Sequence, residues 1–275
     1  MRLQDQLEQW FLKRVDQWID RRPQRPVPPQ RLARARIVAH RGAYDNQQVF
    51  ENTIPAFERF QSAGGWGIEL DVRWTRDGVP VISHDPDGRR LFDVDRAIAD
   101  MDLETLRQRL PLVPTLADIV TRFGGRLHLM VEIKCLPAGG RRPSATLLQG
   151  LFDRLTPSRD YHFLSLDYPL LQHLALTPRE ACIPIARVNF GKVKRAAEAY
   201  GWGGVAGHYT LIRRRQVEAL HRCGFRVGTG FVNSPNSLHR ALCQGVDWLF
   251  SDRPLHLQHM ISSSMPGKAG AGPGR

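Results

Sequence analysis

The sequence has no apolar run long enough to cross a membrane, and it has little cysteine. No window of the 275 residues approaches the roughly 18 to 20 consecutive apolar residues that a membrane-spanning helix needs. Asp5, Glu8 and Lys13 interrupt any apolar stretch near the N-terminus, so we expect no secretory signal. The four cysteines are scattered without a CxxC pair, which is typical of reduced thiols in a cytosolic protein. We therefore expect a cytoplasmic protein.

Acidic residues are absent from the stretch in which arginines are most concentrated. The chain has a formal net charge of +12, and residues 21–36 contain no aspartate or glutamate. A basic protein of this kind can meet nucleic acid, anionic lipid or an anionic small substrate. The stretch has no interleaved aromatic side chains that would stack bases, so we expect no nucleic-acid partner. The arginines are Arg21, Arg22, Arg25, Arg31, Arg34 and Arg36.

Residues 1–35 differ in pattern from the rest of the chain. Apolar side chains recur at spacings of three and four up to residue 22, which predicts an amphipathic helix, followed by a basic, proline-rich linker. Two interpretations stay open: the helix lies on an anionic membrane, or it packs on the body of the protein. The first interpretation predicts peripheral contact with the inner membrane surface through residues 1–30. The apolar positions are Leu3, Leu7, Trp10, Phe11, Val15, Trp18 and Ile19.

Strand and helix signals alternate along the remaining chain, whose composition of 42% hydrophobic and 24% charged residues is that of a soluble globular protein. One of nine predicted strands, Val79–Ser83, is the return arm of a hairpin, and the other eight alternate with helices. Eight is the number that closes an α/β barrel of about 250 residues. We therefore predict an α/β fold, a TIM-like (β/α)8 barrel over residues 36–258 with a β-hairpin after its second strand. A less regular segment follows the hairpin, with one helix near 103–110, and residues 259–275 are predicted to form a disordered tail.

The second predicted strand carries two carboxylates on one face. Glu69 and Asp71 lie two residues apart, so their side chains point to the same side of a sheet. The repulsion between them costs free energy unless a cation or a proton relieves it. With a turn centred near Asp77, the returning strand is predicted to place His84 opposite Asp71. The alternative is a surface hairpin whose charges face water.

The barrel rule places chemistry at the C-terminal ends of the strands. It collects Glu69, Asp71 and Glu132 on one rim, and three carboxylates without a cysteine or histidine cluster suit Mg²⁺ or Ca²⁺. Other side chains predicted for this rim are His40, Arg41, His84 and Lys134, with Ser165, His208, Phe231, Asn233 and Asp252 as weaker candidates from later strands.

Two basic side chains and two histidines on this rim indicate phosphate chemistry. The fork of Arg41 and the point charge of Lys134 suit phosphate oxygens. His40 and His84 would share the proton transfers of phosphodiester cleavage, one as base and one as acid. The rival use of such a site, enolisation or carbon–carbon chemistry at a metal, has no evident need of two histidines and two cations.

Several motifs together resemble the glycerophosphodiester phosphodiesterases over residues 36–255. The resemblance implies a TIM-like barrel, a divalent metal held by Glu69, Asp71 and Glu132, and His40 with His84 as acid and base. It also implies a small phosphodiester substrate, hydrolysed to glycerol 3-phosphate and an alcohol. The motifs are AHRG at 39–42, ENTIPAF at 51–57, IELDVRWTRDGVPVISHD at 68–85, PTL at 114–116, VEIK at 131–134 and GVDWLFSDRP at 245–254.

Other residues border the substrate pocket in this interpretation. Glu51 and Asn52 would touch the metal shell or the substrate, although helix capping is an alternative role for Asn52. Asp85 would orient His84, and Phe231 in TGFVN stands where the family usually has tryptophan. His208 completes the predicted pocket. Two other functions stay open: a lysophospholipase D acting on membrane lysophospholipids, and a non-catalytic phosphate- or lipid-binding barrel.

Overall fold

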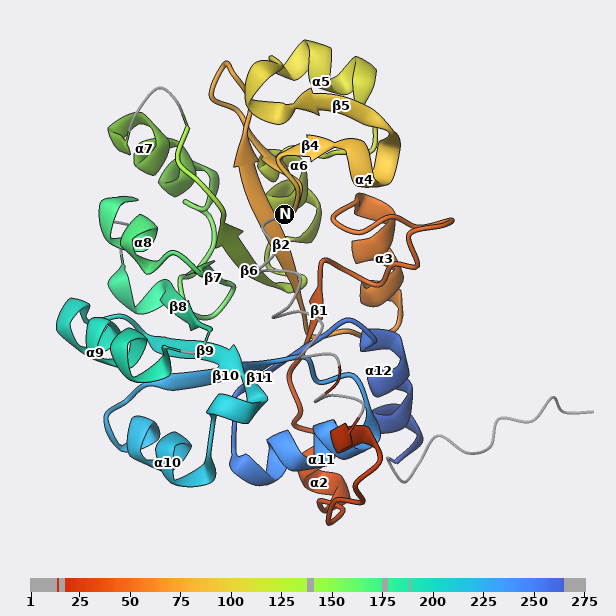
Figure 1. Cartoon of the computed structure of the whole chain (residues 1–275), viewed down its shortest axis with the longest axis vertical. Helices are drawn as coiled ribbons and strands as arrows, with labels where there is room; N and C mark the ends of the chain where they lie inside the picture. Colours follow the sequence, from red (N-terminus) through yellow and green to blue (C-terminus); the bar gives the residue numbers. More distant parts are fainter. Residues whose placement is uncertain (1–13, 15–17, 138–140, 175–177, 188, 265–275) are drawn as a thin grey trace, which may run out of the picture.

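Eight parallel strands close into a ring at the centre of the molecule (Figure 1). The computed structural model describes residues 14, 18–137, 141–174, 178–187 and 189–264. β1 pairs in parallel with both β2 and β11, which closes the ring and confirms the predicted (β/α)8 barrel. The strands are β1 (Ile37–His40), β2 (Gly67–Trp74), β6 (His128–Ile133), β7 (Tyr161–Ser165), β8 (Cys182–Ala186), β9 (Gly204–His208), β10 (Arg226–Gly230) and β11 (Trp248–Ser251).

Helices surround the ring and cover its outer face (Figure 1). The N-cap residue Thr115 starts α6 in a capping box with Asp118, and Pro55 lies in the first turn of α3, where its missing N–H has no consequence. Phe57 and Phe60 of α3 bury their rings against the barrel. The helices are α3 (Ile54–Ser62), α6 (Leu116–Phe123), α7 (Arg141–Leu151), α8 (Tyr168–Leu174), α9 (Phe190–Tyr200), α10 (Arg214–Arg222), α11 (Pro235–Gln244) and α12 (Pro254–Ser263).

The hairpin after β2 is present, but its predicted register is wrong by one residue. β3 (Pro80–Ile82) pairs with β2 so that Val72 faces Ile82, and Ser83 donates a backbone hydrogen bond to Asp71. The cause is the loop between Thr75 and Val79, which has three residues and ends on Gly78 at φ +81°. His84 therefore lies one residue beyond the position opposite Asp71.

An excursion between β3 and α6 forms a small unit beside the barrel, at the top of Figure 1. The sequence predicted only its last helix. It has its own apolar cluster, in which Ile98, Met101 and Leu106 are buried. The elements are β4 (Asp87–Gly88), α4 (Arg89–Phe92), β5 (Val94–Ala97), η1 (Ile98–Asp100) and α5 (Leu103–Arg109).

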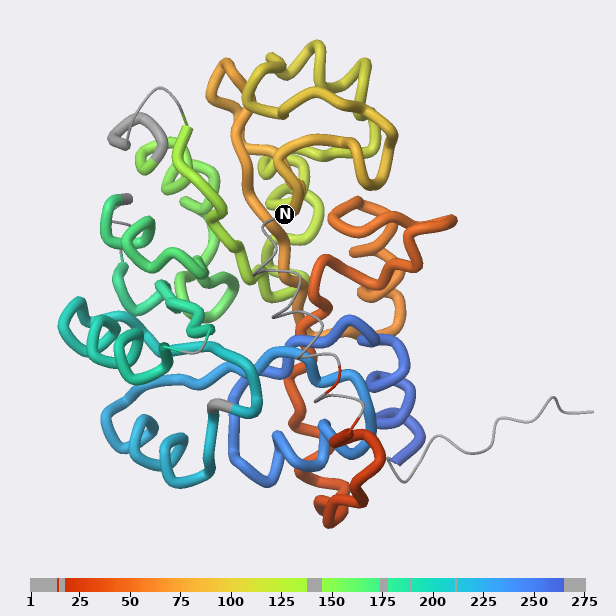
Figure 2. Tube along the Cα trace, viewed as in Figure 1, coloured from red at the N-terminus to blue at the C-terminus, as the bar shows by residue number. Residues whose placement is uncertain are grey.

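The chain before β1 forms a strap over α11, in red beside blue in Figure 2. Ile19 and Val27 are buried, and the backbone N–H of Val27 donates to Nδ1 of His239 over 3.3 Å. Asn236 donates its side-chain amide to the carbonyl oxygen of Asp20 over 2.7 Å. The helix predicted for residues 1–22 lies largely outside the described residues.

The C-terminal boundary differs from the prediction. The barrel was expected to end at residue 258, whereas α12 continues to Ser263 because Ile261 packs its side chain into the core. The remainder of the predicted tail lies outside the described residues. Within the part of the chain that is described, none of the helices combines the length and the apolar character that crossing a bilayer requires.

Two buried histidines lie at the N-terminal end of the barrel, opposite the rim that the C-terminal strand ends form. Nδ1 of His128 donates to the carbonyl oxygen of Arg159 over 2.8 Å, and its Nε2 accepts from Nδ1 of His162 over 2.7 Å. Trp66 stacks on His128 with ring centroids 4.5 Å apart. Burial lowers the pKa of His128 to about 4 and holds the pKa of His162 well below its ordinary value. Both rings are therefore neutral in the folded protein.

This pair predicts acid-sensitive stability. Because the folded-state pKa values are depressed, the unfolded chain binds protons more tightly, and stability is lost as the pH falls from about 6.5 toward 4. His128 alone should cost roughly 2 kcal/mol of unfolding free energy between pH 7 and 5. Urea unfolding across this range should show a flatter pH dependence for H128Q/H162Q than for the wild type. The control H256Q/H259Q changes two exposed histidines of α12 and should keep the wild-type slope.

Candidate active site

Three carboxylates meet at the C-terminal ends of β2 and β6. Strand register places Asp71 beside Glu132, and Glu69 lies two residues before Asp71 on the same face. All three side chains are buried, and each offers an oxygen within 4.8 Å of the others. Burial and the charges of Asp71 and Glu132 raise the pKa of Glu69 to about 8. Oε1 of Glu69 is buried without a hydrogen-bond partner among the described residues. An orphaned oxygen in a cluster of hard oxygen donors fits a divalent cation.

Two basic side chains offset part of this negative charge. Nζ of Lys134 lies 2.9 Å from Asp71 and 3.0 Å from Glu132, and Nε of Arg41 lies 3.4 Å from Asp71. Burial alone would raise the pKa of Asp71, but Lys134 and Arg41 hold it well below its usual range. Arg41 also donates its backbone N–H to Oε2 of Glu69 over 3.1 Å. The predicted partners of phosphate thus contact the predicted metal ligands directly.

Asn52 holds Asp71 rather than capping a helix. Its side-chain amide donates to Oδ2 of Asp71 over 2.8 Å, and its own Oδ1 accepts the backbone N–H of Asp71 over 3.3 Å. Thr53, not Asn52, occupies the N-cap position of α3. Asn52 has φ +58°, in the left-handed region that asparagine tolerates better than most residues.

His40 at the end of β1 has an acidic partner on the last strand loop. Its Nδ1 lies 2.6 Å from Oδ1 of Asp252, and Asn233 donates to the other oxygen of Asp252 over 3.0 Å. Burial and Arg41 lower the pKa of His40, but Glu69 and Asp252 outweigh them and raise it overall. Because an ionised Asp252 only accepts, Nδ1 of His40 carries the proton and Nε2 faces Glu69 at 3.9 Å.

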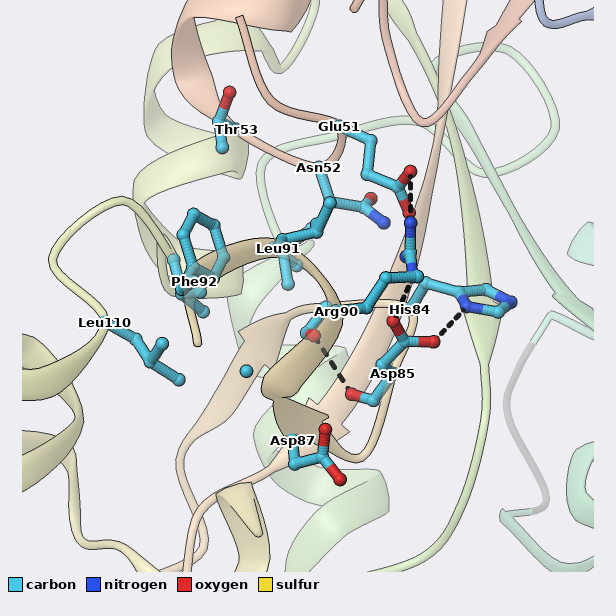
Figure 3. A pocket seen from close by; sticks show the side chains of 14 residues that line it. Glu51, Asn52, Thr53, His84, Asp85, Asp87, Arg90, Leu91, Phe92 and Leu110 are labelled. Carbon is cyan, nitrogen blue, oxygen red and sulfur yellow. Dashed lines mark hydrogen bonds and ion pairs between the residues drawn. The ribbon is translucent and has the colours of Figure 1, made fainter. Parts of the chain in front are cut away.

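His84 is held through a bridge that the sequence did not predict. Its Nδ1 lies 2.9 Å from Asp85, and Arg90 of α4 contacts Asp85 and Glu51 at once, over 2.5 and 2.6 Å (Figure 3). Glu51 also accepts from Arg41 over 2.9 Å. Burial would raise the pKa of Glu51, but Arg90 and Arg41 lower it to about 2. The only signal for this bridge in the sequence is that two consecutive arginines, Arg89 and Arg90, follow closely after the HD dipeptide at 84–85.

A narrow pocket lies beneath Arg90, between the loop before α3 and the excursion (Figure 3). Its polar end is formed by Glu51, His84 and Asp85, and its apolar end by Phe92 and Leu110. The excursion supplies most of the apolar wall of this pocket, and β3 adds Ile82.

Asp252 and Asn233, predicted as weaker candidates, belong to the site through His40, whereas Ser165, His208 and Phe231 lie farther round the ring. His208 contacts Thr210 over 2.7 Å and packs on the rings of Tyr209 and Phe231. Ser165 donates its hydroxyl to the carbonyl oxygen of Ile133, which is a structural role. The described contacts of His208 and Phe231 are thus with each other and their neighbours rather than with the carboxylates.

The chain is similar to known proteins over most of its length. The sequence model of the glycerophosphoryl diester phosphodiesterase family matches residues 40–256. A glycerophosphodiester phosphodiesterase of Caldanaerobacter subterraneus is 26% identical over 245 residues, covering 82% of this chain and 97% of the relative. One from Bacillus altitudinis is 27% identical over 241 residues, covering 80% and 95%.

Solved structures of similar sequence length share the fold. A glycerophosphodiester phosphodiesterase of Thermotoga maritima superposes with a TM-score of 0.68 at 21% identity, covering 82% of this chain and 98% of that one. An Oleispira antarctica phosphodiesterase, solved with the product sn-glycerol-3-phosphate, gives 0.70 at 24% identity, covering 82% and 96%.

Gly42, in the loop after His40, packs closely against α3. It has φ +89°, and an added Cβ would lie 2.8 Å from Cβ of Ala56. Gly78 has a similar φ of +81° but open space around it. We expect G78A to cost about 1 to 2 kcal/mol for its backbone conformation alone. G42A should cost roughly 1 to 3 kcal/mol more in urea unfolding, because it adds overlap with Ala56. Equal losses would mean that the contact with α3 is unimportant.

Proposed function

The chain belongs to the glycerophosphoryl diester phosphodiesterase family, and from this premise we propose that it hydrolyses glycerophosphodiesters by metal-dependent, histidine-assisted catalysis. The products are glycerol 3-phosphate and an alcohol. One observation carries the proposal: three buried carboxylates, two basic side chains and two carboxylate-paired histidines lie along neighbouring strand ends of one rim. We assign this activity to the barrel from residue 36 through α12.

A divalent cation would be held by Glu69, Asp71 and Glu132. All three donors are carboxylate oxygens, which favours Mg²⁺ or Ca²⁺ over metals that prefer nitrogen or sulfur. The bound cation would supply Lewis-acid polarisation of a phosphoryl oxygen.

Arg41 and Lys134 are proposed to bind the phosphate. Each is nine-tenths buried or nearly so and already faces the carboxylates, so the side chains need no large rearrangement to reach an anion beside them. Burial would lower the pKa of Lys134, but Asp71 and Glu132 raise it above its ordinary value, so the ammonium stays charged. Two fixed positive charges in a partly dehydrated site stabilise the extra negative charge that develops on attack.

His40 and His84 are proposed to move the protons. Asp252 orients His40 so that its Nε2 points toward the carboxylates, ready to accept or return a proton. Asp85 holds His84 by the equivalent nitrogen, Nδ1, and leaves Nε2 available. The two side chains come from different strand ends and have separate acidic partners, so one can act as base while the other acts as acid.

Removing either histidine should abolish most of the activity. We expect H40A and H84A each to lower kcat by 10² to 10⁴, the range typical of one general acid or base. The assay is release of glycerol 3-phosphate from glycerophosphocholine and glycerophosphoethanolamine. H256A, which changes an exposed histidine of α12, is the matched control and should keep the wild-type rate.

Failure of this assay has a defined meaning. Wild-type rates in H40A would exclude the histidine mechanism. No release from either compound, with Mg²⁺ or Ca²⁺ present, would contradict the proposed substrate, and lysophospholipids would be tested next. Inactivity on those lipids as well would favour a non-catalytic binding barrel.

Metal binding should depend on the carboxylates themselves. We expect the EDTA-treated protein to bind one divalent cation in isothermal titration with Mg²⁺ or Ca²⁺, and EDTA to abolish the activity. D71N should lose this binding, because it removes the central charge of the cluster. E58Q alters a half-buried glutamate of α3 that pairs with Arg122 rather than with the cluster, and it should bind the cation like the wild type. Equal binding by D71N would contradict the assigned ligands.

A further inference from the structure

Part of the catalytic rim has a composition that the proposed reaction does not explain. The loops after β7, β8, β9 and β10 are neighbours, because these four strands are adjacent in the ring. All four lie at the C-terminal ends of the strands and therefore share the face of the active site. Five exposed side chains of this region define what we call the rim patch: Leu166, Arg213, Arg214, Arg215 and Phe231.

Three consecutive arginines form the charged part of the rim patch. They line a shallow open hollow with Thr210 and Gln216. Arg214 pairs with Glu218 over 2.8 Å, whereas Arg213 and Arg215 have no acidic partner among the described residues. Arg214 and Arg215 occupy the first turn of α10, and no acidic residue lies in that turn. The positive end of a helix disfavours cations, so this charge is unfavourable for the helix and is better explained by a partner.

The exposed apolar side chains of the rim patch also cost free energy, because they face water. Leu166 is 36% exposed and Phe231 is 37% exposed. Phe231 has φ +63°, a left-handed conformation that a bulky residue rarely adopts. This strained backbone keeps a partly exposed aromatic side chain beside His208, at the C-terminal end of β10.

The N-terminal strap brings a further aromatic residue to the same rim. Asn236, which holds the carbonyl of Asp20, lies in the first turn of α11, directly after β10. Trp18 is 52% exposed, and the guanidinium of Arg22 stacks 3.5 Å from its ring centroid. An exposed aromatic ring and a cation thus lie together near the start of α11.

We propose that the rim patch docks on an anionic lipid surface, so that the mouth of the active site faces the membrane. Arginines provide attraction to acidic headgroups, and the leucine and phenylalanine side chains can enter the boundary between headgroups and acyl chains. Complementary charge alone would also suit nucleic acid, but the exposed leucine of the rim patch, which cannot stack on bases, favours lipid. This docking does not depend on the reaction that the site performs.

The test is co-sedimentation of the full chain with vesicles. The wild type should bind vesicles containing 30% phosphatidylglycerol in phosphatidylcholine at 0.1 M NaCl, and should not bind pure phosphatidylcholine. R213E/R214E/R215E should weaken binding on the order of 100-fold. Glutamate at the start of α10 suits the helix dipole, which offsets the loss of the Arg214–Glu218 pair, so this variant should fold and should hydrolyse soluble glycerophosphodiesters at the wild-type rate.

A matched control separates the rim patch from net charge. R126E/R154E/R222E makes the same charge change with three exposed arginines at the opposite end of the barrel, and its vesicle binding should stay within about threefold of the wild type. An equal loss in both variants would overturn the proposal in favour of general charge attraction. Wild-type binding by R213E/R214E/R215E would overturn it, as would binding of a single-stranded oligonucleotide without any binding to vesicles.

Discussion

The repulsion among three buried carboxylates is the constraint around which this rim is built. Glu69, Asp71 and Glu132 come together because parallel strands align their C-terminal ends. Without compensation, such a cluster would take up protons or destabilise the fold. Lys134 and Arg41 supply only part of that compensation, since the pKa of Glu69 remains near 8. The site therefore remains short of positive charge, which is the electrostatic condition for binding a divalent cation.

The backbone around the cluster is shaped by the same requirement. Arg41 and Asn52 both have positive φ, at +58° each, and Gly42 follows at +89°. These conformations let the chain turn sharply after β1, so that the guanidinium of Arg41 and the amide of Asn52 both reach Asp71. The local cost of left-handed residues is offset by hydrogen bonds to a buried charge, which are stronger than bonds between neutral groups.

The sequence was sufficient for the barrel and for the residues on its strand ends. Alternation of strands and helices predicted the ring, and the spacing of Glu69 and Asp71 predicted a shared face. Long-range partners were beyond such reasoning. Asp252 was recognised as a rim residue but not as the partner of His40, 212 positions away. The predicted hairpin register was wrong because a change of one residue in loop length shifts it by one position. The run Arg76–Gly78 is compatible with a two-residue loop as well as with a three-residue loop.

The excursion between β3 and α6 is tied to the site by charge rather than by apolar packing alone. Arg90 joins Asp85, which holds His84, to Glu51, which holds Arg41. A single side chain of the excursion thus contacts the supports of one proposed proton carrier and one proposed phosphate ligand. Because Glu51 is buried between two arginines, loss of either would leave its charge poorly compensated. The position of the excursion is therefore coupled to the positions of Asp85 and Glu51. Sequence changes in the excursion should affect His84 and Arg41 as well as the wall of the pocket.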